Sequence, residues 1–434
     1  MASSELSQFQ IFPMARHNGR SKAAAFFADG ILFVGGVLVA FLVVCAIWSF
    51  FSPTPSAAPS FSTSVVSSRE SSDISAAAAT PAVSCGDGSG PDLGHDTPEQ
   101  NFYDDPKLSY SIDALPVKNW DEKRREWLKQ HPSLSAGAEN RILMVTGSQA
   151  KPCKNPIGDY LLLKLFKNKV DYCRRHGIDI FYNNVLLQPK MFSFWAKTPT
   201  VKAAMLAHPE AEWIWWVDSD AAFTDMDFKL PLDRYKDHNF VVHGWPSLIQ
   251  EKKSWTSINA GVFLIRNSQW AMDFMAVWAS MGPQSPEYDK WEKEKWGNKI
   301  FVEGQYYFEG YWVEIVGTFD NITERYTQIE KEVPALRRRH AEKVSESYAR
   351  AWEEYLKDAG YGRGSWRRPF ITHFTGCQPC SGDHNQMYSG QTCFDAMQKA
   401  LMFADNQVLR NYGFVHPDLL DSSTVNLLPF DYPA

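Results

Sequence analysis

A long apolar segment near the start of the chain limits what this sequence can fold into. Residues 31–51 carry no charge, and these 21 residues match the roughly 20 that a helix needs to span a bilayer. Basic residues precede the segment, whereas residues 52–68 carry no charge at all. The positive-inside rule therefore predicts a cytoplasmic tail over residues 1–30, a transmembrane signal-anchor over residues 31–51 and a lumenal remainder.

A cleaved signal peptide is the alternative interpretation of the same segment. The apolar core of a signal peptide spans roughly 7–15 residues and begins closer to the N-terminus, so the segment is too long and starts too late for one. An uncleaved anchor is therefore the prediction, and it makes the chain a single-pass type II membrane protein.

The cysteine pattern agrees with a lumenal location. Six of the seven cysteines follow the apolar segment, and an even number in an oxidising compartment suits disulfides. These are Cys85, Cys153, Cys173, Cys377, Cys380 and Cys393. The Cys377-x-x-Cys380 spacing does not favour a redox or zinc site, because no second such pair and no thioredoxin-like pattern accompany it. The sequon that begins at Asn321 predicts an N-glycan.

The composition changes after the apolar segment. Residues 52 to about 100 are dominated by Ser, Ala, Pro, Thr and Gly, which cannot bury enough surface to offset the chain entropy. We therefore predict a lumenal stem over residues 52–138, which ends in a helix near residues 121–130, and a catalytic domain over residues 139–434. The net charge of −6 gives no basic field for nucleic acid.

Short apolar runs alternate with helical periodicity from Arg141 onwards. Five runs read as buried strands, at residues 142–146, 178–182, 213–217, 240–243 and 261–265. Three stretches have helical spacing, at residues 159–175, 194–208 and 268–281. This alternation predicts an α/β domain with a mostly parallel sheet flanked by helices, and a ligand site at the carboxyl ends of the strands. The charged residues 324–357 predict a helical, mainly solvated segment.

Two acidic residues follow the third of these apolar runs directly. Asp218 and Asp220 stand at a predicted strand end, where two carboxylates can share a divalent cation with the oxygens of a diphosphate. Oxygen ligands favour Mg²⁺ or Mn²⁺. A second Asp-x-Asp, at Asp225 and Asp227, lies further along the following loop and is predicted to be a chance copy. Haloacid-dehalogenase-like phosphatases also use Asp-x-Asp, but they want Thr or Val where this chain has Ala222.

Several longer motifs surround this acid pair. They lie at residues 146–149, 215–225, 257–267, 307–312, 372–380 and 403–407. In this order they resemble plant glycosyltransferase family 34, which holds galactomannan α-galactosyltransferases and xyloglucan α-xylosyltransferases. The resemblance runs from about Arg141 to the C-terminus. It implies a GT-A-type, Rossmann-like fold, a UDP-sugar donor, and a metal-dependent transfer that retains the α configuration.

Two positions distinguish the branches of that family. Xylosyltransferases commonly carry Lys where this chain has Gln378, and His where it has Glu309, so the chain looks more like the galactosyltransferase branch. The resemblance thus implies transfer from UDP-galactose to O6 of mannose in a (galacto)mannan backbone of the plant cell wall, in the Golgi membrane, alone or with other Golgi glycosyltransferases. A xyloglucan 6-α-xylosyltransferase stays open as the alternative.

The resemblance also implies roles for single residues. Asp218, Asp220 and His373 match the family's ligands for Mn²⁺ or Mg²⁺, although His373 by itself reads as a buried structural histidine. Lys197, which otherwise reads as an exposed helix cation, matches a position near the donor. The residues that match the nucleotide loop or the lining of the donor site are Gly147, Ser148, Gln149, Ser219, Asn259, Gly261, Gly376 and Gln378. Of these, Asn259 and Gln378 are expected to be catalytic together with the acid pair.

One interval departs from the family pattern. Relatives usually carry a longer stretch, with a Glu-Ser-Asp-Asp-Gln-Ser-like motif near the reacting sugar, between the segments that match residues 288–291 and 294–297. Only Glu292 and Lys293 separate these segments here. A catalytically impaired Golgi subunit that binds partner transferases therefore stays open as a second alternative.

Overall fold

The fold was analysed in a computed structural model of the chain. The structure describes residues 101–245, 247–252, 257–282, 296–338, 343–360, 364–380 and 387–428. All of these belong to one compact unit, Cys85–Ala434. The predicted tail, the apolar segment and most of the predicted stem lie outside the described residues, as do Cys85 and the short interval at Glu292. Within the described part, no helix is long and apolar enough to cross a membrane.

A six-stranded sheet forms the centre of this unit, in the order β2-β1-β3-β6-β5-β7. Its strands are β1 (Ile142–Gly147), β2 (Asp179–Asn183), β3 (Trp213–Val217), β5 (Phe240–Gly244), β6 (Ile258–Arg266) and β7 (Ile300–Glu303). The five predicted strands are all present. The pairs β1–β2, β1–β3 and β5–β7 are parallel, whereas β6 runs antiparallel to both β3 and β5. The sheet is therefore mixed, and the amino end of β6 meets the carboxyl ends of the other strands at one edge.

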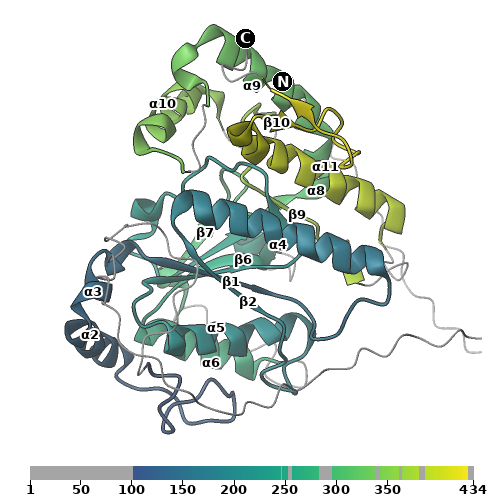
Figure 1. Cartoon of the computed structure of the whole chain (residues 1–434). Coiled ribbons are helices and arrows are strands. Elements are labelled where there is room, and N and C mark those ends of the chain that lie inside the picture. The colour runs from purple at the N-terminus through teal and green to yellow at the C-terminus, as the bar shows by residue number, and fades with distance from the viewer. Residues whose placement is uncertain are drawn as a thin grey trace, which may run out of the picture. The chain divides into compact units, whose positions relative to one another are not determined.

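Helices cover both faces of the sheet (Figure 1). Helix α4 (Pro156–His176) lies on one face, and α5 (Lys197–Ala207) and α6 (Gln269–Ser280) lie on the other. Successive strand residues point to opposite faces. Trp215 thus packs in the core on the α4 side with Tyr172, while Trp216 packs on the α5 and α6 side with Val201. Burial on both faces explains why the strands read as continuous apolar runs.

Polar side chains and a glycine terminate the helices at the sheet. The side chain of Asn155 caps α4 by accepting a hydrogen bond from the Gly158 amide at 2.7 Å, and Gly177 ends the helix in the left-handed conformation, with φ of 66°. Ser268 caps α6 by accepting from the Ala271 amide at 3.3 Å. Such caps satisfy backbone groups that a helix end leaves unpaired. The predicted helix at residues 194–208 begins as a 3₁₀ turn, Ser193–Ala196, before α5.

The end of the predicted stem packs onto the sheet unit. Helix α2 (Trp120–Gln130) confirms the predicted helix, and the shorter α3 (Pro132–Ser135) follows it. Trp120 is fully buried, and its indole donates a hydrogen bond to Oδ1 of Asn267 at 2.8 Å. The amide of Phe102 donates to the carbonyl of Leu206 at 3.1 Å. Residues 101–138 are thus held by the layer that contains α5 and α6.

A C-terminal layer completes the unit. It contains the short sheet β4-β9-β8, formed by β4 (Ala221–Phe223), β9 (Ile371–His373) and β8 (Gly310–Tyr311), and the hairpin of β10 (Phe414–Val415) with β11 (Asn426–Leu427). Its helices are α8 (Trp312–Ile315), α9 (Phe319–Glu332), α10 (Glu346–Leu356) and α11 (Gly390–Leu409).

The predicted helical segment at residues 324–357 is confirmed, and more than half of its described residues are exposed, but its helices also bury an apolar face. Helices α9 and α10 are separate, and Pro334 stands in the turn that follows α9. Helix α9 buries Tyr326, Ile329 and the charged Glu330, which pairs with Arg410. The high charge density conceals an apolar stripe at helical spacing, and this stripe packs against α11.

The cysteines pair across the C-terminal layer. Disulfides join Cys153 to Cys380 and Cys377 to Cys393. The two cysteines of the Cys-x-x-Cys motif therefore belong to different disulfides, which is incompatible with a redox pair or a zinc site. Cys173, a residue of α4, is a buried free thiol, so the expectation that an even number would pair is wrong for this residue. Its side chain lies in the apolar core, 3.6 Å from the sulfur of Met144.

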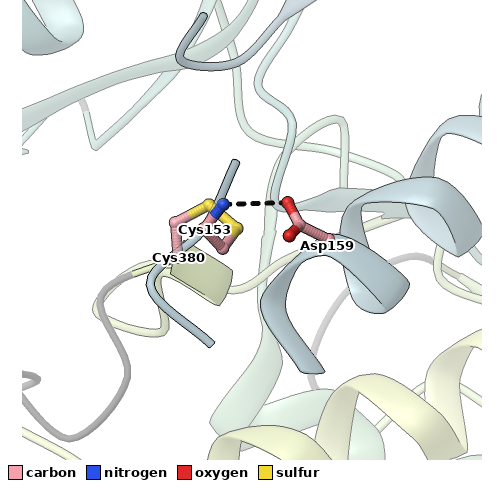
Figure 2. Close-up of side chains that lie close together, drawn as sticks. All are labelled: Cys153, Asp159 and Cys380. Carbon is pink, nitrogen blue, oxygen red and sulfur yellow. Dashed lines mark hydrogen bonds between the residues drawn. A yellow bond between two sulfur atoms is a disulfide. The ribbon is translucent and has the colours of Figure 1, made fainter. Parts of the chain in front are cut away.

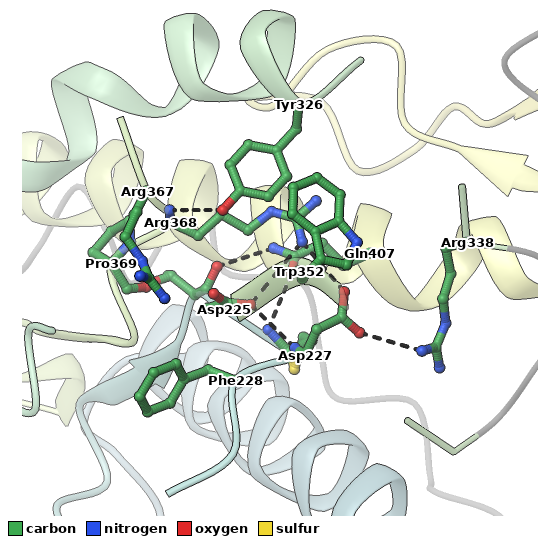
Figure 3. A network of polar contacts seen from close by, with 12 residues as sticks. Asp225, Asp227, Phe228, Tyr326, Arg338, Trp352, Arg367, Arg368, Pro369 and Gln407 are labelled. Carbon is green, nitrogen blue, oxygen red and sulfur yellow. Dashed lines mark hydrogen bonds and ion pairs between the residues drawn. The ribbon is translucent and has the colours of Figure 1, made fainter. Parts of the chain in front are cut away.

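The second Asp-x-Asp is a structural cluster (Figure 3). Asp227 pairs with Arg175 and lies 3.3 Å from Arg368 and 3.6 Å from Arg338. Although burial opposes the effect, Arg175 and Arg338 hold the pKa of Asp227 below its usual range. Burial raises the pKa of neighbouring Asp225 to about 6. The pair is therefore no cation site but an ionic anchor between the sheet and the C-terminal layer.

Candidate active site

The first acid pair lies at the edge where the carboxyl ends of the strands meet. Asp218 follows β3 directly, and its amide donates to the carbonyl of Gly261 on β6 at 2.8 Å. The turn at Asp220 leads into β4, whose antiparallel pairing with β9 sets Ala221 opposite His373. This pairing brings an imidazole from late in the chain beside the acids.

Three side chains converge there. The ligand atoms of Asp218, Asp220 and His373 all lie within 4.8 Å of one another. Nε2 of His373 is 3.3 Å from Oδ1 of Asp220 and 3.9 Å from Oδ2 of Asp218. The side chain of His373 is only 6% exposed, whereas those of Asp218 and Asp220 are 25% and 17% exposed. Two accessible carboxylates and one imidazole form a donor set that suits Mn²⁺ or Mg²⁺.

Lys197 is buried against the acid pair rather than exposed on its helix. Its Nζ donates to Oδ1 and Oδ2 of Asp218 at 2.9 and 3.2 Å, and to the carbonyl of Ala260 at 2.8 Å. The indole of Trp216 donates to the same carboxylate at 2.5 Å. The reading of Lys197 as an exposed cation is therefore wrong, while its expected place near the donor stays a prediction.

Lys169 is a second lysine under the acid pair, and it is not among the predicted site residues. It lies on α4, is 1% exposed, and donates to the carbonyls of Ala221 at 2.7 Å and Ser219 at 3.1 Å. Burial lowers the pKa of Lys169 to about 8, although Asp220 and Asp218 raise it. The spacing of Leu161, Leu165 and Lys169 along one helix face was the available signal for its burial.

Glu309 is also missing from the predicted site residues. Its side chain is fully buried, and its Oε1 lies 2.7 Å from Nδ1 of His373. Burial raises the pKa of Glu309 to about 7, although His373 lowers it. A Cβ atom on Gly261 would overlap Cε1 of His373 and lie 2.5 Å from Oε1 of Glu309. Gly261 is therefore required for these two side chains to meet.

The expected nucleotide loop follows β1. A Cβ atom at Gly147 would overlap the carbonyl oxygen of Asn183, so the close approach of β1 to β2 requires glycine there. The Ser148 amide donates to that carbonyl at 3.1 Å, and the Ser148 hydroxyl lies 2.6 Å from the hydroxyl of Tyr182. The side-chain amide nitrogen of Gln149, Nε2, donates to the sulfur of Cys380.

A disulfide holds two of the predicted segments together (Figure 2). Cys153, in the loop after β1, is bonded to Cys380, which follows Gly376 and Gln378 in the segment after β9. The Cys153 amide also donates to the carboxylate of Asp159 at the start of α4, at 2.9 Å. Gly376 has φ of 86°, a left-handed conformation that favours glycine. Predicted residues from the two ends of the domain thus lie on linked loops.

Of the remaining predicted residues, Asn259 and Ser219 lie near the acid pair, whereas Asn321 lies in α9. Asn259 lies at the start of β6, where its amide is 3.5 Å from Nδ1 of His373. Ser219 lies inside the acidic turn, held through its carbonyl by Lys169. Asn321 is exposed in the first turn of α9, a helix of the C-terminal layer. Glycosylation at Asn321 stays a prediction.

Known proteins resemble this chain over nearly its whole length. Residues 138–384 match the galactosyl transferase GMA12/MNN10 family, and the chain belongs to this family of glycosyltransferases. The predicted resemblance is thereby confirmed.

Relatives from two activities differ in their similarity to the chain. Galactomannan galactosyltransferase 1 of Cyamopsis tetragonoloba is 53% identical over 450 residues, covering 97% of this chain and 100% of that protein. Glycosyltransferase 6 of Arabidopsis thaliana is 55% identical over 443 residues, covering 95% of this chain and 98% of its own. Xyloglucan 6-xylosyltransferase 1 of Arabidopsis thaliana is 40% identical over 354 residues, covering 74% and 69%.

Proposed function

We propose that the chain transfers galactose from UDP-galactose to O6 of mannose residues in a β-linked mannan backbone. The convergence of Asp218, Asp220 and His373 carries the proposal, because these donors would hold a cation after β3, next to β1, which the expected nucleotide loop follows. The choice of galactose rests on the higher identity to the galactomannan enzyme than to the xylosyltransferase. We further propose that the chain works in the Golgi lumen behind the anchor at residues 31–51.

The donor set fits the cation that the family resemblance implies. Asp218, Asp220 and His373 would hold Mn²⁺ or Mg²⁺, which when bound neutralises the charge that develops on departing UDP. The buried ammonium groups of Lys197 and Lys169 lie beside the same acids. They reduce the repulsion that a diphosphate would otherwise meet there.

The other residues serve to position the donor. Gly147 and Ser148 carry no bulky side chain, so their backbone leaves room for the diphosphate. The side-chain amides of Asn259 and Gln378 would orient the hydroxyls of the sugar. The acceptor 6-hydroxyl attacks on the face that UDP leaves, which keeps the α configuration. A double displacement through a carboxylate would give the same stereochemistry. Glu309, buried behind His373, offers no exposed nucleophile for it.

Product analysis tests this function. The full chain, purified in mild detergent, is incubated with Mn²⁺, a manno-oligosaccharide and UDP-galactose, and separately with a cello-oligosaccharide and UDP-xylose. The proposal predicts an α-1,6-galactosylated manno-oligosaccharide as the product, and a loss of at least about 100-fold in kcat for Asp218→Asn combined with Asp220→Asn. Xylose on the cello-oligosaccharide as the only product would reject the galactosyl assignment.

A second candidate, an impaired subunit that binds partner transferases, is favoured by the short interval at Glu292 and Lys293. A version of the chain with the family's Asp-Asp-Gln stretch restored separates the two. The impaired-subunit function predicts turnover only in the restored version, with UDP binding equal in both. Turnover in the unaltered chain supports the catalytic function instead.

A further inference from the structure

A buried carboxylate stands behind the candidate cation site. The side chain of Glu309 has no exposed surface. Glu309 lies just before β8, and β8 pairs with β9, the strand that carries His373. Within the described part of the chain, Oε2 of Glu309 has no hydrogen-bond partner. Burying a charge without full compensation costs free energy of folding, so we expect a carboxylate at this position to have a function.

The geometry around His373 indicates what that function is. Among the described residues, its Nδ1 has three polar neighbours: Oε1 of Glu309 at 2.7 Å, Oγ1 of Thr375 at 3.1 Å and Nδ2 of Asn259 at 3.5 Å. The carboxylate is the nearest, and it accepts hydrogen bonds only. Nε2, on the other side of the ring, faces Asp220 at 3.3 Å.

The two ring nitrogens therefore have different surroundings. A carboxylate at Nδ1 favours the tautomer with its proton on that nitrogen, which leaves the lone pair of Nε2 directed at the acid pair. Ligating histidines commonly donate their second N–H to such a group, which fixes the ring orientation and raises ligand basicity. Gly261 allows the contact, because a Cβ atom there would lie against both side chains.

We propose that Glu309 is a positioning residue, whose carboxylate holds the His373 ring so that Nε2 completes the cation site with Asp218 and Asp220. The inference rests on the proposed function, since it needs a divalent cation between those three side chains. A purely structural role for Glu309 would instead make it a contributor to stability alone.

Three variants of the full chain separate these roles. Glu309→Met keeps the length of the side chain and removes the acceptor, and replacing a buried charge by an apolar group of similar size is often neutral for stability. Glu309→Asp keeps the charge and withdraws it from Nδ1. Glu303→Met is the control, because Glu303 is equally buried but contacts Tyr235 and Arg234 instead.

Mn²⁺ affinity in the presence of UDP, measured by electron paramagnetic resonance, is the readout, with the unfolding temperature measured in parallel. We expect Glu309→Met and Glu309→Asp to bind Mn²⁺ about 10–100-fold more weakly without a matching loss of unfolding temperature. Glu303→Met should lower the unfolding temperature and leave the affinity unchanged.

The outcomes distinguish a failure of the proposed function from a failure of the positioning role of Glu309. If the unaltered chain does not bind Mn²⁺ with UDP, the proposed function itself fails. If the unaltered chain binds and the folded Glu309→Met variant binds equally well, the positioning role is overturned. Should Glu309→Met not fold, Glu309→Asp decides in the same way.

Discussion

Nζ of Lys197 lies 2.9 Å from Oδ1 of Asp218, although Lys197 begins helix α5 and Asp218 follows strand β3 of the sheet that α5 covers. The lysine side chain is 8% exposed and the aspartate 25%, so the pair lies between the core and the open site. A diphosphate that approached the acid pair would meet this ammonium as well. The contact therefore joins the buried start of α5 to the charged acid pair.

Replacing Lys197 by Met should therefore weaken donor use. The change removes hydrogen bonds to a charged group, each worth about 1.5–3 kcal/mol, which corresponds to a loss of roughly 10–100-fold in kcat/KM for the donor. Steady-state kinetics with UDP-galactose measure the effect. Lys190→Met serves as control, since Lys190 pairs with Asp113 on the surface. Equal losses in both variants would contradict the assigned role of Lys197.

Gly261→Ala should disable the site without unfolding the domain. The added methyl group would overlap His373 and press on Glu309, so the imidazole must move away from Asp218 and Asp220. We expect at least a tenfold loss of Mn²⁺ affinity in the presence of UDP. Gly317→Ala is the matched control, because no atom lies within 4 Å of a Cβ there. Wild-type affinity in Gly261→Ala would show that the close approach is unimportant.

Removing the Cys153–Cys380 disulfide should affect donor binding more than removing the other. The bond joins the nucleotide loop to the loop of Gln378, whereas the Cys377–Cys393 bond ties that loop to α11. Paired Cys→Ser variants should each lose about 2–5 kcal/mol of stability. Only the Cys153 and Cys380 pair should also raise the KM for UDP-galactose. A similar KM in both double variants would argue against a shared donor site on the two loops.

The second Asp-x-Asp predicts a specific pH dependence of stability. Burial raises the pKa of Asp225 to about 6 from 3.8, so the native state binds a proton that the unfolded state lacks between these values. Stability from this residue is therefore present below about pH 4 and lost as the pH rises to about 6, by roughly 2–3 kcal/mol. The lowered pKa of Asp227 acts oppositely: its contribution is present above the unfolded value of 3.8 and is lost as the pH falls below it.

Asp225→Asn should flatten the stability profile between pH 4 and 6. Urea unfolding at several pH values, beside Asp358→Asn as an exposed control, measures this. A profile in Asp225→Asn as steep as in the unaltered chain would mean that another group is responsible.

Much of the fold follows from local sequence patterns. The strand at residues 213–217 is an unbroken apolar run because both of its faces are covered, and α4 has its cap, apolar stripe and terminal glycine in order. Strand direction has no local signal, so the antiparallel course of β6 could not be read from residues 261–265. Burial within a charge-rich helix was missed for a related reason, because Glu330 finds its partner Arg410 far along the chain.

The site was predictable only in part. The acid pair has a local signal, a strand end, but His373 is placed by β4 and β9, each only three residues long. Pairing of such short strands is decided by the packing around them, which a local pattern does not encode. The family resemblance supplied His373, and neither it nor the pattern pointed to the roles of Lys169 and Glu309. Those depend on contacts between distant segments.

The most direct test of the central claim is calorimetric titration of UDP into the full chain with and without Mn²⁺. The account predicts UDP binding that depends on Mn²⁺ and that falls at least about 100-fold when Asp218 and Asp220 are both replaced by Asn, while the same change at Asp225 and Asp227 weakens folding but not the cation requirement. UDP binding that is equally tight without Mn²⁺, or unchanged in the Asp218 and Asp220 variant, would contradict it.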